Sequence, residues 1–288
     1  MWVKIGFIGA GKVGNTLGQY FIQKQLDVGG YYSRRISTAV KGAERTNSKV
    51  FSKLEELIEQ VDMIFITTAD DAIAQVVNQI ADTKLIRKEH ILIHTSGVHS
   101  TDVFEQLVHV GCGVYSMHPL QSFADADSAV KRIHKTHFTI EGNGVHLCKI
   151  TEMFEKINNP YYMIENKQKE LYHAGACVIS NYLVTLMSVG FDFIEASGFP
   201  KESIYSAFEP LIYSTLENIK DKGPEQSLTG PICRGDMETI KEHMQAIKNS
   251  NMELEFYKYM GLKTLGMLEK SNALDENKEA IKKMLVED

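Results

Sequence analysis

A glycine-rich turn close to the N-terminus constrains the fold of this chain more than any other feature. Glycines stand at positions 9, 11 and 14, directly after the apolar run Val3–Ile8 and at the start of a helical pattern over Val13–Lys24. The first glycine allows a tight turn, the second lets the backbone approach a pyrophosphate, and the third lets the helix pack closely on the strand. This order predicts the first unit of an α/β fold that binds a dinucleotide, with a purely structural turn as the alternative.

Short apolar runs alternate with helical patterns through the first half of the chain. The runs expected to form strands are Val3–Ile8, Gly29–Ser33, Met63–Thr67, Ile91–His94, Gly113–Met117, Phe138–Ile140 and Tyr161–Ile164. The segments expected to form helices are Val13–Lys24, Leu54–Glu59, Asp71–Ile80 and Asp102–His109. This alternation predicts an α/β fold with an N-terminal Rossmann-type, mostly parallel sheet that is covered by helices on both faces.

The pattern changes after about Pro160, and from Gln168 onward it is helical. The expected helices are Glu170–Ala196, Ser203–Lys220, Asp236–Lys248, Glu253–Glu269 and Glu276–Leu285. We therefore predict a nucleotide-binding domain over residues 1–165 and an all-helical domain over residues 166–288.

The charge and the cysteines exclude several classes of protein. A net charge of −6 gives no global attraction to nucleic acid or to an anionic membrane surface, so neither is an expected partner. No apolar run approaches the roughly 20 residues of a membrane helix, and the N-terminus lacks the pattern of a signal peptide. The four cysteines are scattered without a CxxC pair, so we expect neither a metal site nor a disulfide framework, and we expect a cytoplasmic protein.

The end of the second predicted strand selects the cofactor. A site for NAD usually places an acidic residue there to hold the ribose 2′-hydroxyl, whereas this chain has Ser33, Arg34 and Arg35. Two guanidiniums and a hydroxyl suit the dianionic 2′-phosphate of NADP(H), with a solvated basic loop as the alternative. Loops after later strands should also line the cofactor crevice, although their Thr and Ser residues are also common helix caps. The predicted cofactor-binding residues are Gly9, Ala10, Gly11, Lys12, Val13, Gly14, Ser33, Arg34, Arg35, Thr68, Ala69 and Ser96.

His118 stands in the most unusual stretch of the chain, followed by Pro119 at the end of a predicted strand. Proline holds the preceding residue in an extended backbone, which aims the imidazole into the crevice at the strand ends. Gln121 and Ser96 are expected to add polar contacts to the substrate there. Because histidine is readily tuned to move protons near neutral pH, we expect His118 to be catalytic. A loop histidine that is hydrogen-bonded to backbone is the alternative.

A polar stripe runs along the long predicted helix. His173, Cys177 and Asn181 recur every four residues and therefore share one face. A polar His and Asn on this face suit a helix that lines a polar cleft, so we expect both to be catalytic. Hydrogen bonds between helices, with the cysteine as a small core residue, are the alternative.

A loop with two glycines and a proline supplies the third group of candidates. Arg234 could bind a substrate carboxylate bidentately, and Thr229 is a further donor in the same loop. Asp236 is a candidate for substrate binding or, alternatively, the N-cap of the following helix.

Taken together, these residues resemble a known family, the NADP oxidoreductases that join a Rossmann-like domain to a DUF2520 domain. The segments that carry the resemblance are Gly9–Gly14, His118–Phe123, Tyr172–Leu183 and Leu228–Asp236. More distantly, the chain is similar to the β-hydroxyacid dehydrogenase, pyrroline-5-carboxylate reductase and ketopantoate reductase group, which reduces a C=O or C=N beside a carboxylate. The resemblance implies NADP(H), a small carboxylate substrate and a homodimer through the helical domain.

The resemblance implies reduction of a small 2-oxo acid, with 2-dehydropantoate of pantothenate biosynthesis as the best specific substrate. The related hydroxyacid dehydrogenases carry a catalytic Lys four residues before an Asn; if that Asn is Asn181, this chain has Cys177 in its place. A thiol cannot replace an ammonium as proton donor, so His118 or His173 would serve, with Asn181 and Ser96 holding the substrate oxygen. An imine reductase of the pyrroline-5-carboxylate type and a non-catalytic NADP(H)-binding sensor are the alternatives.

Overall fold

The computed structural model describes residues 3–271, 273 and 275–287 and divides into two compact units, Met1–Asn181 and Tyr182–Asp288. The division lies inside one long helix, α7 (Lys169–Ala196), which contributes its first half to the first unit. The predicted boundary between residues 165 and 166 stays a prediction, because the helix that follows it belongs to both units.

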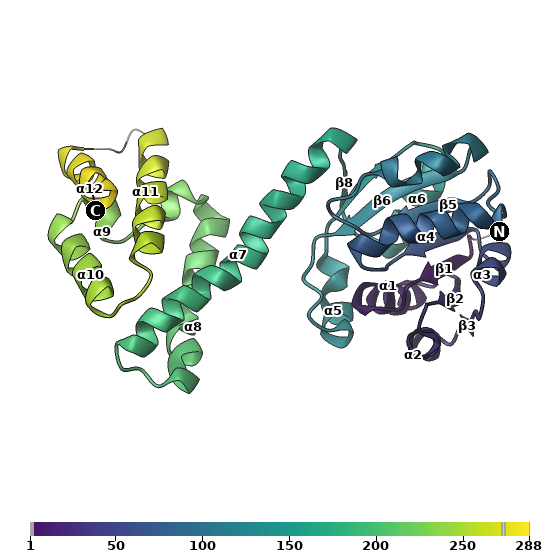
Figure 1. Cartoon of the computed structure of the whole chain (residues 1–288), viewed down its shortest axis with the longest axis horizontal. Helices are drawn as coiled ribbons and strands as arrows, with labels where there is room; N and C mark the ends of the chain where they lie inside the picture. Colours follow the sequence, from purple (N-terminus) through teal and green to yellow (C-terminus); the bar gives the residue numbers. More distant parts are fainter. Residues whose placement is uncertain (1–2, 272, 274, 288) are drawn as a thin grey trace. The chain divides into compact units, whose positions relative to one another are not determined.

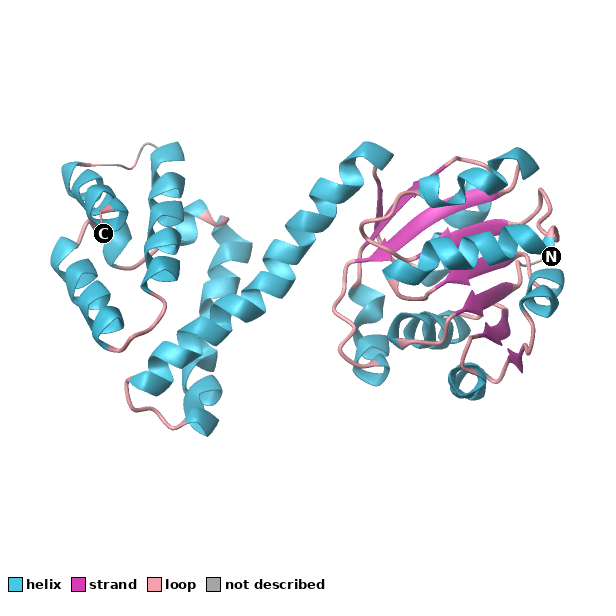
Figure 2. Cartoon of the chain, in the orientation of Figure 1, coloured by secondary structure: helices cyan, strands magenta, loops and turns pink. Residues whose placement is uncertain are grey.

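The first unit is built on one eight-stranded sheet with the order β3-β2-β1-β4-β5-β6-β7-β8 (Figures 1 and 2). The strands are β1 (Ile5–Ile8), β2 (Val28–Tyr32), β3 (Lys49–Val50), β4 (Met63–Ile66), β5 (Ile91–His94), β6 (Gly113–Pro119), β7 (Phe138–Gly142) and β8 (Tyr161–Met163). All neighbouring strands are parallel except β6 and β7, which are antiparallel. The predicted α/β class with a mostly parallel Rossmann-type sheet is confirmed.

Helices cover both faces of this sheet because its central strands are apolar on both sides. Along β4, Met63 and Phe65 belong to one buried cluster, whereas Ile64 and Ile66 belong to the other. Such alternation places successive side chains on opposite faces. The helices of this unit are α1 (Lys12–Gln23), α2 (Ile36–Thr46), α3 (Leu54–Gln60), α4 (Asp70–Thr83), α5 (Ala126–Arg132) and α6 (Leu147–Ile157). The 3₁₀ helices are η1 (Thr101–Val110), η2 (Ile133–Lys135) and η3 (Asn166–Gln168).

The second unit is helical in its described residues. Its elements after α7 are α8 (Lys201–Lys222), η4 (Glu225–Ser227), α9 (Pro231–Arg234), α10 (Met237–Asn249), α11 (Leu254–Lys270) and α12 (Glu276–Val286). The buried cluster of this unit joins Ile240, Leu265, Ile281 and Leu285, which come from α10, α11 and α12. The partly buried Ile232 of α9 packs against this cluster, so the four C-terminal helices share one small core.

Several elements differ from the sequence predictions. The helix expected over Asp102–His109 is the 3₁₀ helix η1, and the strand expected to end at Met117 extends through Pro119. The helices α2, α5, α6 and α9 were not predicted. Helix α2 buries only Ala39, Gly42, Ala43 and Thr46, so its packed face consists of small residues, whereas its larger apolar residues Ile36 and Val40 are exposed.

Helix α7 also corrects the expectation about apolar segments. Within the described residues, Asn166–Ala196 is the one helix long and apolar enough to cross a membrane by length and composition, with a mean hydropathy of 1.6 over its most apolar window. Isolated polar residues such as His173 and Asn181 interrupt its apolar runs without lowering this mean much. A helix that packs on another protein surface meets the same criterion.

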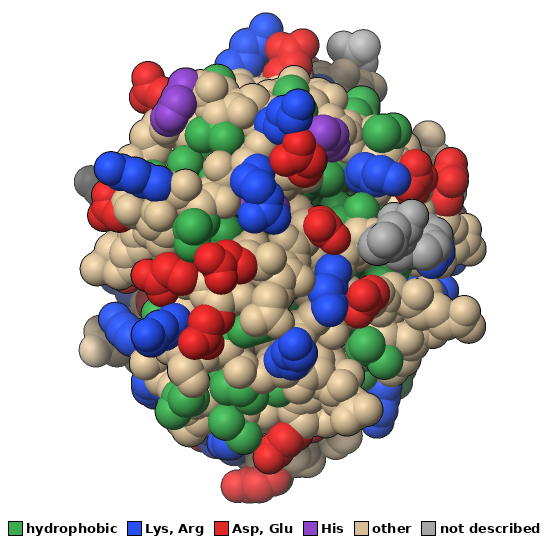
Figure 3. Space-filling model, turned by 90° about the vertical axis from the view of Figure 1, so that its right-hand side faces the viewer, with side chains coloured by type: hydrophobic (Ala, Val, Ile, Leu, Met, Phe, Trp, Pro, Cys, Tyr) green, Lys and Arg blue, Asp and Glu red, His purple; other side chains and the backbone are tan. Residues whose placement is uncertain are grey.

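Charges of both signs are interspersed on the face of the molecule in Figure 3. Such a mixed surface gives no long-range field of one sign. An anionic ligand approaching this face must therefore be held by local groups.

Candidate functional site

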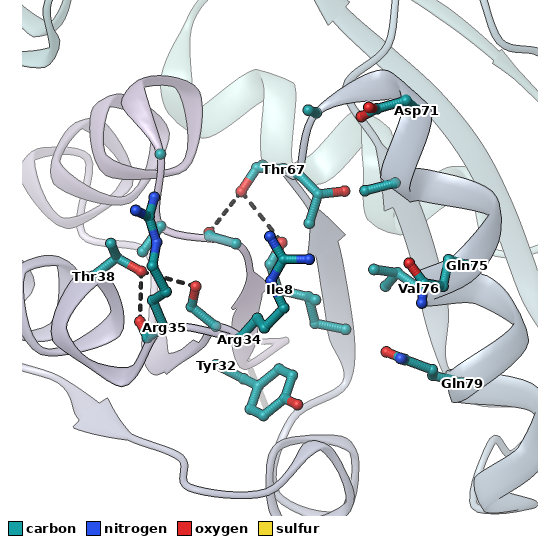
Figure 4. A pocket seen from close by; sticks show the side chains of 17 residues that line it. Ile8, Tyr32, Arg34, Arg35, Thr38, Thr67, Asp71, Gln75, Val76 and Gln79 are labelled. Carbon is teal, nitrogen blue, oxygen red and sulfur yellow. Dashed lines mark hydrogen bonds between the residues drawn. The ribbon is translucent and has the colours of Figure 1, made fainter.

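A cavity of about 590 Å³ lies where β1, β2 and β4 end (Figure 4). Its lining residues come from the ends of these strands, from the loops that follow them and from helices α2 and α4: Ile8, Gly9, Ala10, Gly11, Tyr32, Ser33, Arg34, Arg35, Thr38, Thr67, Thr68, Ala69, Asp71, Ala72, Gln75, Val76 and Gln79. The carboxyl ends of parallel strands are where open α/β sheets bind their ligands.

The glycines of the first turn fit close backbone packing around this cavity. Gly9 has a φ of +97°, and a Cβ there would lie 2.9 Å from the carbonyl carbon of Thr67. A Cβ on Gly14 would lie 2.7 Å from the carbonyl oxygen of Gly9, so the start of α1 can approach β1 only without a side chain. At Gly11 a Cβ would meet no atom within 4 Å, which leaves open space beside the backbone of the turn.

Polar groups at this turn are available to an anion. No side chain of the described residues caps the N-terminus of α1 at Gly11, so its first N–H groups remain open to a ligand. The hydroxyl of Thr68 is buried without a hydrogen-bond partner in the described part of the chain. A dinucleotide pyrophosphate fits this combination of open space, helix N-terminus and unpartnered hydroxyl.

The loop after β2 brings two arginines to the cavity (Figure 4). The hydroxyl of Thr38 lies 2.8 Å from the hydroxyl of Ser33 and 2.7 Å from the carbonyl oxygen of Arg35, so it holds the loop in shape. Among the described residues, neither Arg34 nor Arg35 forms an ion pair with a carboxylate. Both guanidiniums are therefore available to a phosphate.

Most of the predicted cofactor residues line this cavity. Those that do are Gly9, Ala10, Gly11, Ser33, Arg34, Arg35, Thr68 and Ala69, while Lys12, Val13 and Gly14 continue into the first turn of α1. Sequence reasoning missed Gln75 and Gln79 of α4, although Ala72, Gln75, Val76 and Gln79 have the spacing of one helical face. That spacing was the signal that could have found them.

A second polar group surrounds Gly97, in the loop after β5. His118, near the end of β6, has its Nδ1 2.7 Å from the hydroxyl of Tyr172, and its ring centroid lies 6.0 Å from that of His173. A Cβ on Gly97 would lie 3.0 Å from Nε2 of His118 and would also collide with the His173 ring. The structure thus brings the two predicted catalytic histidines together around this glycine.

Lys169, at the first position of α7, was missed by the sequence analysis. Its side chain is buried with 1% exposure, and its Nζ donates to the carbonyl oxygen of Ser96, at 3.3 Å, and to the hydroxyl of Ser116. Burial lowers the pKa of Lys169 to about 8. Burial and then the charge of Lys169 lower the pKa of His118 to about 4, so this imidazole is uncharged at neutral pH. In the sequence Lys169 stands among other polar residues, between Gln168 and Glu170, so no motif singles it out.

Two family models match the chain, and together they span most of it. A Rossmann-like domain matches residues 1–119, and a domain of unknown function, DUF2520, matches residues 136–264. The chain joins a Rossmann-like domain to a DUF2520 domain. In this pair, the cavity lies within the Rossmann-like part and Lys169, Tyr172 and His173 lie within the DUF2520 part.

Solved structures share this fold. A protein of Bacteroides fragilis, provisionally described as an NADP oxidoreductase, gives a TM-score of 0.74 at 20% identity over 91% of this chain and 98% of its own. The Thermotoga maritima protein TM1727 gives 0.72 at 25% identity over 93% and 99%. The pyrroline carboxylate reductase of Plasmodium falciparum, solved with NADP bound, gives 0.59 at 17% identity over 98% of both chains.

A curated relative matches a shorter region. The L-aspartate dehydrogenase of Methanocaldococcus jannaschii is 28% identical over 99 residues, which are 33% of this chain and 36% of that protein. The chain therefore matches about a third of the length of this relative.

The remaining predicted residues of the first unit have different surroundings. The hydroxyl of Ser96 accepts from the backbone N–H groups of the two residues 98 and 99, and its side chain is buried away from the nucleotide cavity. The amide of Gln121 is engaged at both ends, donating to the carbonyl of Ala129 and accepting from the hydroxyl of Thr136. Cys177 places its sulfur 3.9 Å from Nδ1 of His173, and Asn181 is exposed.

The three predicted residues of the DUF2520 loop lie in the second unit. Asp236 is the N-cap of α10 and accepts from the backbone N–H and the hydroxyl of Thr239, at 3.2 and 2.8 Å. Arg234 lies 4.0 Å from the Asp236 carboxylate, and its side chain and that of Thr229 are exposed. In the described residues, no cluster of three His, Cys, Asp or Glu could hold a metal ion.

Proposed function

We propose that this protein is an NADP(H)-dependent oxidoreductase. The observation that carries the proposal is the cavity at the ends of β1, β2 and β4, with an uncapped helix N-terminus on one side and two unpaired arginines on the other. When bound, the nicotinamide group supplies or accepts a hydride, while the protein supplies orientation and electrostatics.

Within this proposal, each anionic part of the cofactor has its own partner in the chain. The open backbone at Gly11 and the unpartnered hydroxyl of Thr68 would hold the pyrophosphate. Arg34 and Arg35 would bind the 2′-phosphate, because guanidiniums match phosphate oxygens in bidentate hydrogen bonds. The loop after β2 offers no carboxylate to hold a free 2′-hydroxyl, which favours NADP(H) over NAD(H).

For the substrate, we propose a small molecule whose C=O or C=N stands beside a carboxylate, with 2-dehydropantoate as the first candidate. The reaction would then be reduction of a 2-oxo acid to a 2-hydroxy acid. His118 would face the reacting oxygen as an uncharged imidazole. In the tautomer with its proton on Nε2, the ring receives a hydrogen bond from Tyr172 at Nδ1 and donates one from Nε2.

The uncharged state of His118 favours a second candidate, an imine reductase of the pyrroline-5-carboxylate type. A developing alkoxide needs a proton, and an imidazole with a pKa of about 4 carries no extra proton to give at neutral pH. A protonated imine already carries its proton, so the protein needs only to orient it. The similarity in fold to a pyrroline carboxylate reductase agrees with this candidate.

An assay of NADPH oxidation by the purified protein separates the candidates. Turnover of 2-dehydropantoate supports the first candidate, and turnover of cyclic imino acids supports the second. Tight binding of NADPH without oxidation by any tested oxo acid or imine identifies a non-catalytic sensor. If His118→Ala and His173→Ala both keep wild-type turnover, the histidine assignment is wrong. Rescue of a pantothenate-requiring strain that lacks ketopantoate reductase tests the first candidate inside cells.

We also propose that the protein is a homodimer through its long helices, and that it is cytoplasmic. Helix α7 buries only Lys169, and apolar side chains such as Leu171 and Ile179 are 81% and 77% exposed. Helix α8 buries only Ile204. Apolar surface of this extent is stabilised when a second copy covers it. Light scattering on the purified protein tests the mass.

A further inference from the structure

Three buried ionisable side chains surround the loop that carries Gly97. His94 of β5, Glu141 of β7 and Lys169 of α7 are at most 6% exposed. The two neighbours on β6 and β7, Ser116 and Glu141, are directly opposite each other in the sheet. Burying ionisable groups is costly unless they are hydrogen-bonded, so each should have a defined partner.

Two of the three, His94 and Glu141, form hydrogen bonds with the two ends of the loop. The backbone N–H of Ser96 donates to Nδ1 of His94 at 3.2 Å, and Nε2 of His94 lies 3.2 Å from the carbonyl oxygen of Ser100. His94 is therefore the neutral tautomer with its proton on Nε2, in agreement with a pKa lowered to about 3 by burial and by the charge of Lys169. Glu141 accepts from both the backbone N–H and the hydroxyl of Thr101, the first residue of η1.

Lys169 holds the middle of the loop. Its ammonium donates to the carbonyl oxygen of Ser96 and to the hydroxyl of Ser116, which itself donates to the same carbonyl oxygen at 3.2 Å. Within the described residues, no carboxylate lies within 4.0 Å of this ammonium. The charge of Lys169 thus has no ion-pair partner. A neutral side chain could fill the same space without the charge.

We propose that Lys169 is a positioning residue of the oxidoreductase site, whose ammonium clamps the Ser96–Gly97 turn against His118 and His173. The inference rests on the proposed function. The backbone at Gly97 lies very close to both rings: a Cβ there would be 2.9 Å from Cε1 of His118 and would press against the ring of His173. A small shift of the turn would therefore change its fit against both histidines. The place where a reacting group meets these rings therefore depends on where the clamp sets the loop.

The clamp also has an electrostatic consequence. The groups that face His118 are Lys169, His173 and Tyr172, all on α7. Burial lowers the pKa of His118 most, and the charge of Lys169 lowers it further. The carboxylates that act on Lys169 are Glu141, Asp70 and Glu170, from β7, α4 and α7. Removal of the ammonium should therefore let His118 take up a proton at higher pH, while the nucleotide cavity keeps all its lining residues.

The test compares Lys169→Met with a matched control, Lys258→Met. Lys258 is a second buried lysine, 5% exposed, which donates to the carbonyl oxygen of Glu287 in the second unit. Histidine NMR titrations should show the His118 midpoint rising by at least about one pH unit in Lys169→Met and staying unchanged in the control. Turnover should fall at least about tenfold in Lys169→Met alone, with NADPH Kd within about threefold of wild type in both.

A folded Lys169→Met protein with an unchanged His118 midpoint, or with wild-type turnover, overturns the proposal. If this variant does not fold, Ser116→Ala takes its place, because it keeps the ammonium but removes one of its acceptors. It should lower kcat without moving the His118 midpoint, and wild-type kcat would overturn the clamp. The titration needs no substrate, so failure of wild-type protein to bind or oxidise NADPH refutes the proposed function separately.

Discussion

Replacing both Arg34 and Arg35 by serine should weaken NADPH binding about hundredfold while NADH binding stays nearly unchanged. A hydrogen bond to a charged group contributes about 1.5–3 kcal/mol. Both guanidiniums are exposed at the edge of the cavity, so the lower end of that range applies to each. Since about 1.4 kcal/mol corresponds to tenfold in Kd, each single replacement should cost about tenfold. NADH presents a hydroxyl in place of the 2′-phosphate and gains little from either arginine.

The assay is a fluorescence titration of both cofactors at one fixed ionic strength, because salt screens exposed charges. Arg132→Ser is the matched control for each single replacement. Arg132 is an exposed arginine of α5 that lies outside the cavity, and its guanidinium is 3.4 Å from the hydroxyl of Ser128. The reasoning is refuted if NADPH and NADH lose affinity by the same factor, or if Arg132→Ser weakens NADPH as much as Arg34→Ser does.

Four further predictions rest on the same structure. Gly97→Ala should lower turnover at least about tenfold, because its Cβ would lie 2.9 Å from His118. The Kd for NADPH should stay unchanged, and equal losses of turnover and of NADPH affinity would contradict this prediction. Turnover should stay level as pH falls from about 8 to about 6 and decline only towards pH 4, where His118 becomes charged. The free energy of unfolding should also decrease as pH falls from 6.5 to about 4, because His118 takes up a proton in the unfolded chain but not in the folded chain over this range. Urea unfolding at several pH values measures the direction of this change. Ile179→Glu should shift the protein towards monomer in light scattering without changing NADPH Kd, and an unchanged dimer would remove Ile179 from the proposed interface.

The elements that local patterns describe best are those with strong periodicity. The strands β1, β2, β4 and β5 were predicted to within a residue or two because each is a short run of mostly apolar residues and glycines that ends at a glycine or polar turn. Helix α2 was missed because its packed face is made of small residues. The 3₁₀ form of η1 was missed because an apolar repeat of three to four residues does not distinguish it from an α-helix.

Local sequence described the nucleotide cavity better than it described the Gly97 loop. The cavity is built mainly from short segments, residues 8–11, 32–35 and 67–69, in each of which the residues follow one another directly in the sequence. Its additional residues on α4 required the helix to be placed over the strand ends.

What the sequence by itself determined is the α/β class, the glycine turn and the pair of arginines after the second strand, because each depends on neighbours a few residues apart. What only the tertiary structure decided is the role of Lys169. Its two acceptors, Ser96 and Ser116, lie 73 and 53 residues away along the chain and meet it only where β5, β6 and α7 pack together. The charge state of His118 depends on that burial and on that ammonium, and neither is a property of the residues beside it in sequence.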